Sequence, residues 1–95
     1  MSATVLIVDD EENARLNISS FLSGRGYEII CAATLAEARE SLRREDADIV
    51  LLDVQLPDGY GPSLLGSMVP TRKPSFIRAT ERWIAVGFAR LFPPH

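Results

Sequence analysis

The chain has 95 residues, of which 46% are hydrophobic and 24% charged, and its net charge is −3. This length predicts one small globular domain and excludes a multidomain enzyme or a regulator with its own output module. The charge argues against nucleic-acid binding, and no apolar run is long enough to cross a membrane. With one cysteine, Cys31, and no signal-peptide pattern, we expect a soluble, cytoplasmic protein in which Cys31 is a small buried hydrophobe.

The first 60 residues alternate between strand and helix patterns. Residues 5–8 form an aliphatic run typical of a strand buried on both faces, and residues 11–23 repeat apolar positions at helical spacing before Gly24. Residues 27–32 predict a second strand. Thr34 and Glu37 form a capping box that predicts a second helix, with Arg43 and Arg44 at its end.

A third strand is predicted over residues 49–52, which are aliphatic and run directly into Asp53. Residues 57–61 read as a loop, and residues 62–68 as the beginning of a third helix. The order β-α-β-α-β with short connections requires parallel strands and right-handed crossovers. The fold class is therefore α/β, the first half of a doubly wound parallel sheet, with strand order 2-1-3.

Three aspartates follow buried strands of this predicted sheet. Asp9 and Asp10 follow the first strand, and Asp53 follows the third. The carboxyl ends of parallel strands meet at one edge, so we expect the three side chains to converge there. Converging carboxylates repel one another unless a cation lies between them, and magnesium prefers such oxygen ligands while leaving positions for phosphoryl oxygens. The pattern predicts a magnesium site for phosphoryl chemistry.

Two segments together resemble the receiver domain of bacterial two-component response regulators, which has a flavodoxin-like fold. They are Val5-Leu6-Ile7-Val8-Asp9-Asp10-Glu11 and Ile49-Val50-Leu51-Leu52-Asp53-Val54-Gln55-Leu56-Pro57-Asp58-Gly59-Tyr60-Gly61. The likeness covers roughly residues 3–65. It implies a phosphoacceptor module rather than an enzyme that turns over a substrate, with a sensor histidine kinase or a phosphotransfer protein as its partner.

The resemblance also implies roles for individual residues. Asp53 matches the phosphoacceptor, and Asp10 matches the main magnesium-binding acid. Asp9 matches the acid that orients the waters of the metal, and Gln55 matches the position that offers a backbone carbonyl to it. Asp58 reads first as a turn residue, and we expect no chemistry from it.

The likeness ends after residue 65. The family continues with a fourth strand ending in Ser or Thr and a fifth ending in a lysine, and that lysine would lie beyond His95. Thr80 stands near the place of the switch hydroxyl, although Arg78 fits poorly in a buried central strand. Strands four and five are therefore in doubt, and the phosphate signal would lack its usual readout.

Charge changes at the same point. Residues 1–65 hold twelve acids and five arginines, whereas residues 66–95 hold five basic residues and one acid. We expect a core over 1–65 and a basic, apolar tail over 66–95 that is helical from Ser75, with a truncated or frame-shifted end. The third strand would then lack a neighbour on one side, which invites self-association.

Two other functions remain open. The chain could be a remnant without activity whose apolar tail drives self-association. A magnesium-dependent phosphohydrolase with an aspartyl-phosphate intermediate is the other alternative, but such enzymes carry a second aspartate two residues after the nucleophile, where this chain has Gln55. A nucleotide-binding fold is disfavoured, because acids rather than glycines follow the first strand.

Overall fold

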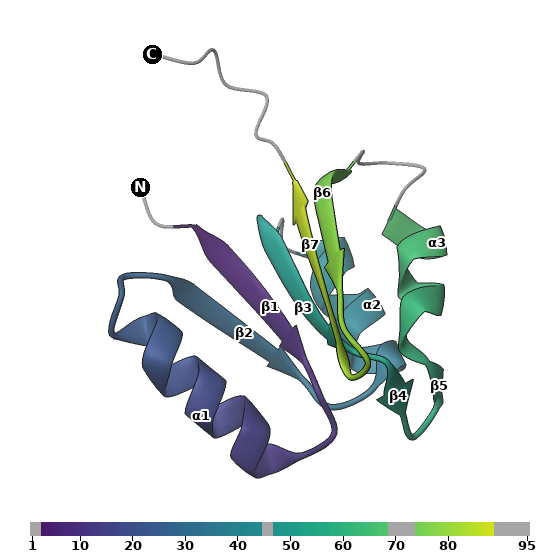
Figure 1. Cartoon of the computed structure of the whole chain (residues 1–95), viewed down its shortest axis with the longest axis horizontal. Helices are drawn as coiled ribbons and strands as arrows, with labels where there is room; N and C mark the ends of the chain where they lie inside the picture. Colours follow the sequence, from purple (N-terminus) through teal and green to yellow (C-terminus); the bar gives the residue numbers. More distant parts are fainter. Residues whose placement is uncertain (1–2, 45–46, 69–73, 89–95) are drawn as a thin grey trace.

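The fold is one five-stranded sheet with helices on both faces (Figure 1), seen in a computed structural model that describes residues 3–44, 47–68 and 74–88. Its strands are β1 (Thr4–Val8), β2 (Glu28–Ala32), β3 (Ile49–Asp53), β6 (Pro74–Ala79) and β7 (Trp83–Phe88). Its helices are α1 (Glu12–Ser23), α2 (Leu35–Arg44) and α3 (Leu64–Met68), the last preceded by a 3-10 turn at Gly61–Ser63. Strands β4 (Gln55–Leu56) and β5 (Gly59–Tyr60) make a separate small hairpin.

The first three strands are parallel and lie in the order β2-β1-β3. In the register of β1 with β3, Val5 lies beside Ile49 and Val8 beside Leu52, so both strands end at the same edge. The predicted strand order and α/β class are confirmed. The sheet as a whole is mixed, because β7 is antiparallel to β3 and β6 is antiparallel to β7.

The main core lies between the sheet and the helices α2 and α3, which cover one of its faces (Figure 1). Alternate residues of the strands point to this face, as the two-residue period of a strand requires. The helices contribute Leu35 and Ala38 from α2 and Leu64 from α3. From the strands come the buried side chains of Leu6, Val8, Val50, Leu52, Ile84, Val86 and Phe88.

Helix α1 alone covers the other face of the sheet among the described elements (Figure 1). Val5 and Ile7 of β1 are buried on that side, yet none of the residues of α1 is fully buried. Phe21 is 60% exposed and its ring lies under the guanidinium of Arg25, at 4.4 Å. Helix α1 is therefore held by less apolar contact than α2. No helix in the described part of the chain has the length and hydropathy required to cross a membrane.

The expected helix from Ser75 is wrong for the described residues, which form the hairpin of β6 and β7 instead. Ile84 and Phe88 fit a helical spacing, but they also fit a strand together with Val86, and all three are buried in the core. β-branched residues favour the extended backbone. The turn is closed by Thr80, whose backbone N–H donates to the carbonyl oxygen of Trp83 at 2.8 Å.

The third strand also keeps a neighbour, contrary to expectation. β7 pairs with β3 from Ile49 opposite Gly87 to Asp53 opposite Trp83, so β3 is internal and the edges of the sheet are β2 and β6. Arg78 lies on the edge strand β6, where its exposed side chain causes no burial problem. Cys31 is exposed on the edge strand β2, so its expected burial is wrong as well.

A pair of substitutions distinguishes the hairpin from a helix. Val86→Ala removes methyl groups that are fully buried, so it should lower the free energy of unfolding by about 2 kcal/mol. Its register partner Ile77 is 54% exposed, and Ile77→Ala should cost about 0.5 kcal/mol or less. Urea unfolding followed by circular dichroism measures both. A larger loss for Ile77→Ala would contradict the hairpin, because the helical stripe buries Ile77 and exposes Val86.

Candidate functional site

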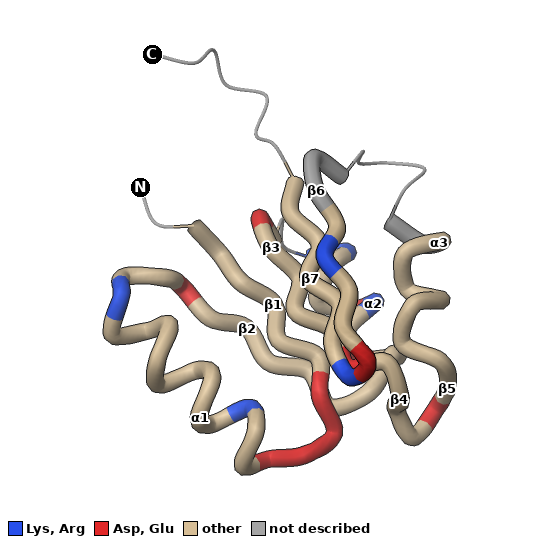
Figure 2. The backbone as a smooth tube through the Cα atoms, viewed as in Figure 1, with Lys and Arg blue, Asp and Glu red and all other residues tan. Residues whose placement is uncertain are grey.

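The register of β1 with β3 brings three carboxylates together at the carboxyl edge of the sheet. Val8 lies beside Leu52, so the residues that follow, Asp9 and Asp53, emerge side by side. Carboxylate oxygens of Asp9, Asp10 and Asp53 lie within 4.8 Å of one another. Figure 2 shows the acidic segment between β1 and α1 at this edge, close to the turn of the β6–β7 hairpin. The predicted convergence is confirmed as geometry.

Asp9 is the buried member of this acidic cluster. Its residue is 1% exposed, and its Oδ2 atom has no hydrogen-bond partner among the described residues. Burial raises the pKa of the Asp9 carboxyl, and the charges of Asp53 and Asp10 add to the rise, against a lowering by the backbone N–H of Glu11. A buried acceptor without a partner is costly, so this oxygen is available to a cation.

Two aspartates of the cluster are each oriented by a local hydrogen bond of the same kind, from the backbone N–H two residues later. The backbone N–H of Glu11 donates to Oδ1 of Asp9 at 3.0 Å, and that of Gln55 donates to Oδ1 of Asp53 at 3.2 Å. Asp side chains favour such bonds to the amide two residues later. In addition, Arg15 donates from Nη1 to the backbone carbonyl of Asp9 at 2.6 Å, which holds the acidic loop against α1.

A close backbone approach fixes the loop after Asp53. The N–H of Gly61 donates to the carbonyl oxygen of Val54 at 2.7 Å. A Cβ atom at position 61 would lie 1.9 Å from the carbonyl oxygen of Asp53, so only glycine fits there. Gly59, at φ 150°, makes the second tight position of this loop. The small β4–β5 hairpin thus folds back on the end of β3.

Asp58, at the tip of that hairpin, caps the N-terminus of α2. Its two carboxylate oxygens accept hydrogen bonds from the backbone N–H groups of Leu35 at 2.9 Å and Ala36 at 3.1 Å. These bonds lower the pKa of Asp58, since they favour the charged carboxylate. One half of the predicted capping box is present, since Thr34 Oγ1 accepts from the N–H of Glu37 at 3.1 Å, while the Glu37 carboxylate accepts from the N–H of Ala33 at 3.0 Å. The helix α2 is therefore tied to the loop of Asp53.

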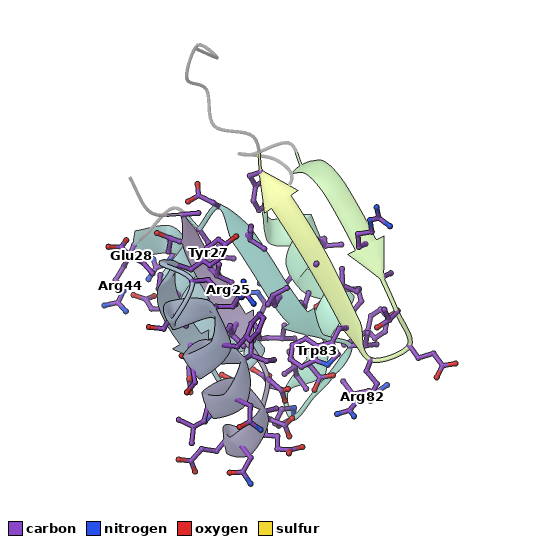
Figure 3. The ribbon with its side chains drawn as sticks, turned by 60° about the vertical axis from the view of Figure 1, so that its left-hand side comes forward. Arg25, Tyr27, Glu28, Arg44, Arg82 and Trp83 are labelled. Atoms are coloured by element: carbon purple, nitrogen blue, oxygen red, sulfur yellow. The ribbon has the colours of Figure 1, made fainter. Side chains whose placement is uncertain are left out.

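The turn of the β6–β7 hairpin borders the acidic cluster from the other side. Trp83 lies opposite Asp53, and the carbonyl oxygen of Arg82 accepts from the N–H of Val54 at 3.0 Å. In Figure 3, Arg82 and Trp83 emerge together where β7 begins. Thr80 uses its hydroxyl within the turn, accepting from the N–H of Trp83 at 3.0 Å. Since β7 separates β6 from β3, Thr80 is one strand away from Asp53, and its switch role stays a prediction.

The donor set fits a hard divalent cation. Three carboxylates of like charge converge, and one buried oxygen among them has no partner in the described part of the chain. Magnesium takes a few carboxylate oxygens and completes its shell with carbonyl oxygens and waters. The backbone N–H of Gln55 donates to Asp53, and the role of its carbonyl oxygen as a metal ligand stays a prediction. The cluster can therefore hold a metal ion.

The sequence predicted the acidic residues of the cluster but not the hydrogen bonds that hold the neighbouring loops in place. Asp9, Asp10, Asp53 and Gln55 lie together, whereas Thr80 does not lie on the strand beside β3. The helix-capping role of Asp58 and the contact of Arg15 with the acidic loop leave no signal in a single sequence, because each joins residues through the fold. His95, Arg72 and Lys73, which carried no site prediction, lie outside the described residues.

Comparison with known proteins shows the family of this chain. The model of the family described as response regulator receiver domain matches residues 5–82. The chain belongs to this family. The Brucella abortus protein named sensor kinase CckA is 35% identical over 94 residues, which cover 97% of this chain and 10% of that protein. The Pseudomonas aeruginosa transcriptional regulatory protein GltR is 36% identical over 61 residues, 64% of this chain and 25% of that protein.

Solved receiver structures share the fold. The signal receiver domain of a putative Luxo repressor protein from Vibrio parahaemolyticus superposes with a TM-score of 0.69 at 23% identity, over 74% of this chain and 54% of that one, and shows the fold alone. A CheY-like response regulator receiver domain from Methanospirillum hungatei gives 0.68 at 34% identity, over 76% and 58%. This receiver chain thus spans a little over half of the two solved chains and a small part of the two curated relatives.

The lowered pKa of Asp58 predicts a pH-dependent contribution to stability. A carboxyl whose folded pKa lies below its unfolded value stabilises the fold above the unfolded pKa, about 3.9 for Asp, and loses this effect as pH falls through the folded pKa. Asp58→Asn should therefore lower the urea midpoint at pH 7 and change it much less at pH 3. The exposed acid Glu81 supplies the control, Glu81→Gln. An equal loss for Asp58→Asn at both pH values would refute charge-dependent capping.

The acidic cluster predicts a stability response to divalent cations. Without metal, Asp53→Asn removes one of three repelling charges and should raise the melting temperature by a few degrees, about 0.5 kcal/mol. Magnesium should raise the melting temperature of the wild type by mass action, and much less that of the variant. Differential scanning fluorimetry with and without MgCl₂ measures this. Glu12→Gln, in an exposed acid of α1, should respond like the wild type.

Proposed function

We propose that this receiver chain is a phosphoacceptor of a two-component phosphorelay, working in the cytoplasm. In this proposal Asp53 takes a phosphoryl group from a phosphohistidine of a sensor histidine kinase or a phosphotransfer protein. The observation that carries it is the convergence of Asp9, Asp10 and Asp53 within 4.8 Å at the carboxyl edge, in a chain of the receiver family. One relative's name, sensor kinase, supports a kinase-driven relay.

The chemistry is a transfer between two nucleophiles. A carboxylate oxygen of Asp53 attacks phosphorus, the P–N bond to the donor histidine breaks, and its electron pair stays on the imidazole nitrogen, which takes a proton. Asp53 suits this role because it is half-buried at the end of β3 and its Oδ1 is already oriented by the N–H of Gln55. In this proposal its second oxygen makes the attack.

Asp9 and Asp10, with the backbone carbonyl of Gln55, are the proposed magnesium ligands. When bound, magnesium neutralises charge on the phosphoryl oxygens and on the acids around them. Asp9 contributes the buried oxygen that lacks a partner among the described residues. The N–H of Glu11 and the guanidinium of Arg15 hold the loop of these acids in place, so ordering it costs little at the moment of transfer.

Acetyl phosphate tests the proposal without knowledge of the partner. Incubated with it and MgCl₂, the intact chain should gain the mass of one phosphoryl group, which hydroxylamine removes. Asp53→Asn should gain none, and Glu12→Gln should gain as much as the wild type. A folded wild-type protein that stays unmodified, or one modified equally in Asp53→Asn, would overturn the proposal. Continued release of phosphate from a generic ester would instead favour a phosphohydrolase.

A further inference from the structure

The turn of the β6–β7 hairpin carries a positively charged side chain, Arg82, next in sequence to the residue that pairs with the candidate phosphoacceptor Asp53. The backbone of Arg82 is fixed there, because its carbonyl oxygen accepts from the N–H of Val54, the residue after Asp53. The next residue, Trp83, lies directly opposite Asp53 in the ladder of β3 and β7. Figure 3 shows the side chain of Arg82 projecting beyond the beginning of β7, at the edge where the strand meets the turn.

The side chain of Arg82 is available for an anion. It is exposed, and it has no ion-pair partner within 4.0 Å in residues 3–44, 47–68 and 74–88. Arg15, which also lies near the cluster, already donates to the backbone carbonyl of Asp9. Among these two arginines, Arg82 is therefore the one whose donors are uncommitted.

The length and the charge of the Arg82 side chain both favour a phosphoryl group on Asp53 as its binding partner. Neighbouring strands lie about 4.8 Å apart, which is less than the length of an extended arginine side chain, so the Arg82 side chain, one residue before the register partner of Asp53, is long enough to span the gap between β7 and β3. A phosphoryl group there carries terminal oxygens that one divalent ion does not fully neutralise, and guanidinium is well matched to such oxygens through two parallel hydrogen bonds.

We infer that Arg82 is a phosphoryl-binding residue, whose guanidinium donates hydrogen bonds to the oxygens of the group carried by Asp53. This assignment rests on the proposed phosphoacceptor function. The turn residues Thr80 and Trp83 serve it by fixing the backbone of the hairpin, through the bonds between the N–H of each and an oxygen of the other. Arg82 thus supplies from an antiparallel hairpin the positive charge that the phosphorylated state requires.

Binding of beryllium trifluoride with MgCl₂, which mimics a phosphoryl group on an aspartate, tests this directly. Trp83 is the single tryptophan, so its fluorescence reports on the site, and calorimetry gives an independent affinity. Arg82→Ala should bind the mimic about tenfold more weakly, as expected for a charge-assisted hydrogen bond. Arg82→Lys should recover part of the loss, because it keeps the charge. Magnesium alone should bind Arg82→Ala at least as tightly as the wild type.

The matched control is Arg78→Ala, which removes an exposed arginine from β6 of the same hairpin and should bind the mimic like the wild type. Circular dichroism shows whether each variant folds. If the wild type gains a phosphoryl group from acetyl phosphate while Arg82→Ala binds the mimic as tightly as it does, the role of Arg82 alone is refuted. If the wild type gains none on Asp53, the phosphoacceptor proposal fails, and the role of Arg82 fails with it.

Discussion

Repulsion between carboxylates at one edge of the sheet is the constraint around which the rest of this receiver chain is arranged. The β1–β3 register forces Asp9 beside Asp53, and burial raises the pKa of Asp9 further. Local amides, the guanidinium of Arg15 and the close approach of Gly61 hold the loops in spite of that repulsion. A site held in this way favours a cation over water, which is what metal-assisted phosphoryl chemistry needs.

The elements whose patterns are local could be predicted from the sequence. The aliphatic runs before Asp9 and Asp53 identify buried parallel strands, and Thr34 with Glu37 identifies the beginning of α2. The rule that parallel strands share a carboxyl edge then suffices to assemble the acidic cluster without coordinates. Each of these inferences depends either on a pattern within a few residues or on the rule that parallel strands end at a common edge, which β1 and β3 obey.

The remainder depends on contacts that only the folded chain makes. Ile84 and Phe88 are compatible with both a helix and a strand, and only the pairing of Val86 with Val50 in the sheet decides for the strand. The same pairing makes β3 internal and carries Arg82 to the edge of the site. Asp58 is similar: its two hydrogen bonds span more than twenty positions of sequence, which no local pattern records.

Helix α1 has a thermodynamic consequence for the acids that precede it. None of its residues is fully buried, and Leu16 and Phe21 are more than half exposed. Such weak burial is typical of a segment that opens locally before the rest of the domain unfolds. Its Arg15 anchors the loop of Asp9, so local opening of the helix would also release this contact with the acidic loop. By linkage, an ion bound at the proposed metal site would keep the helix closed, so amide exchange in α1 should slow as the ion concentration rises.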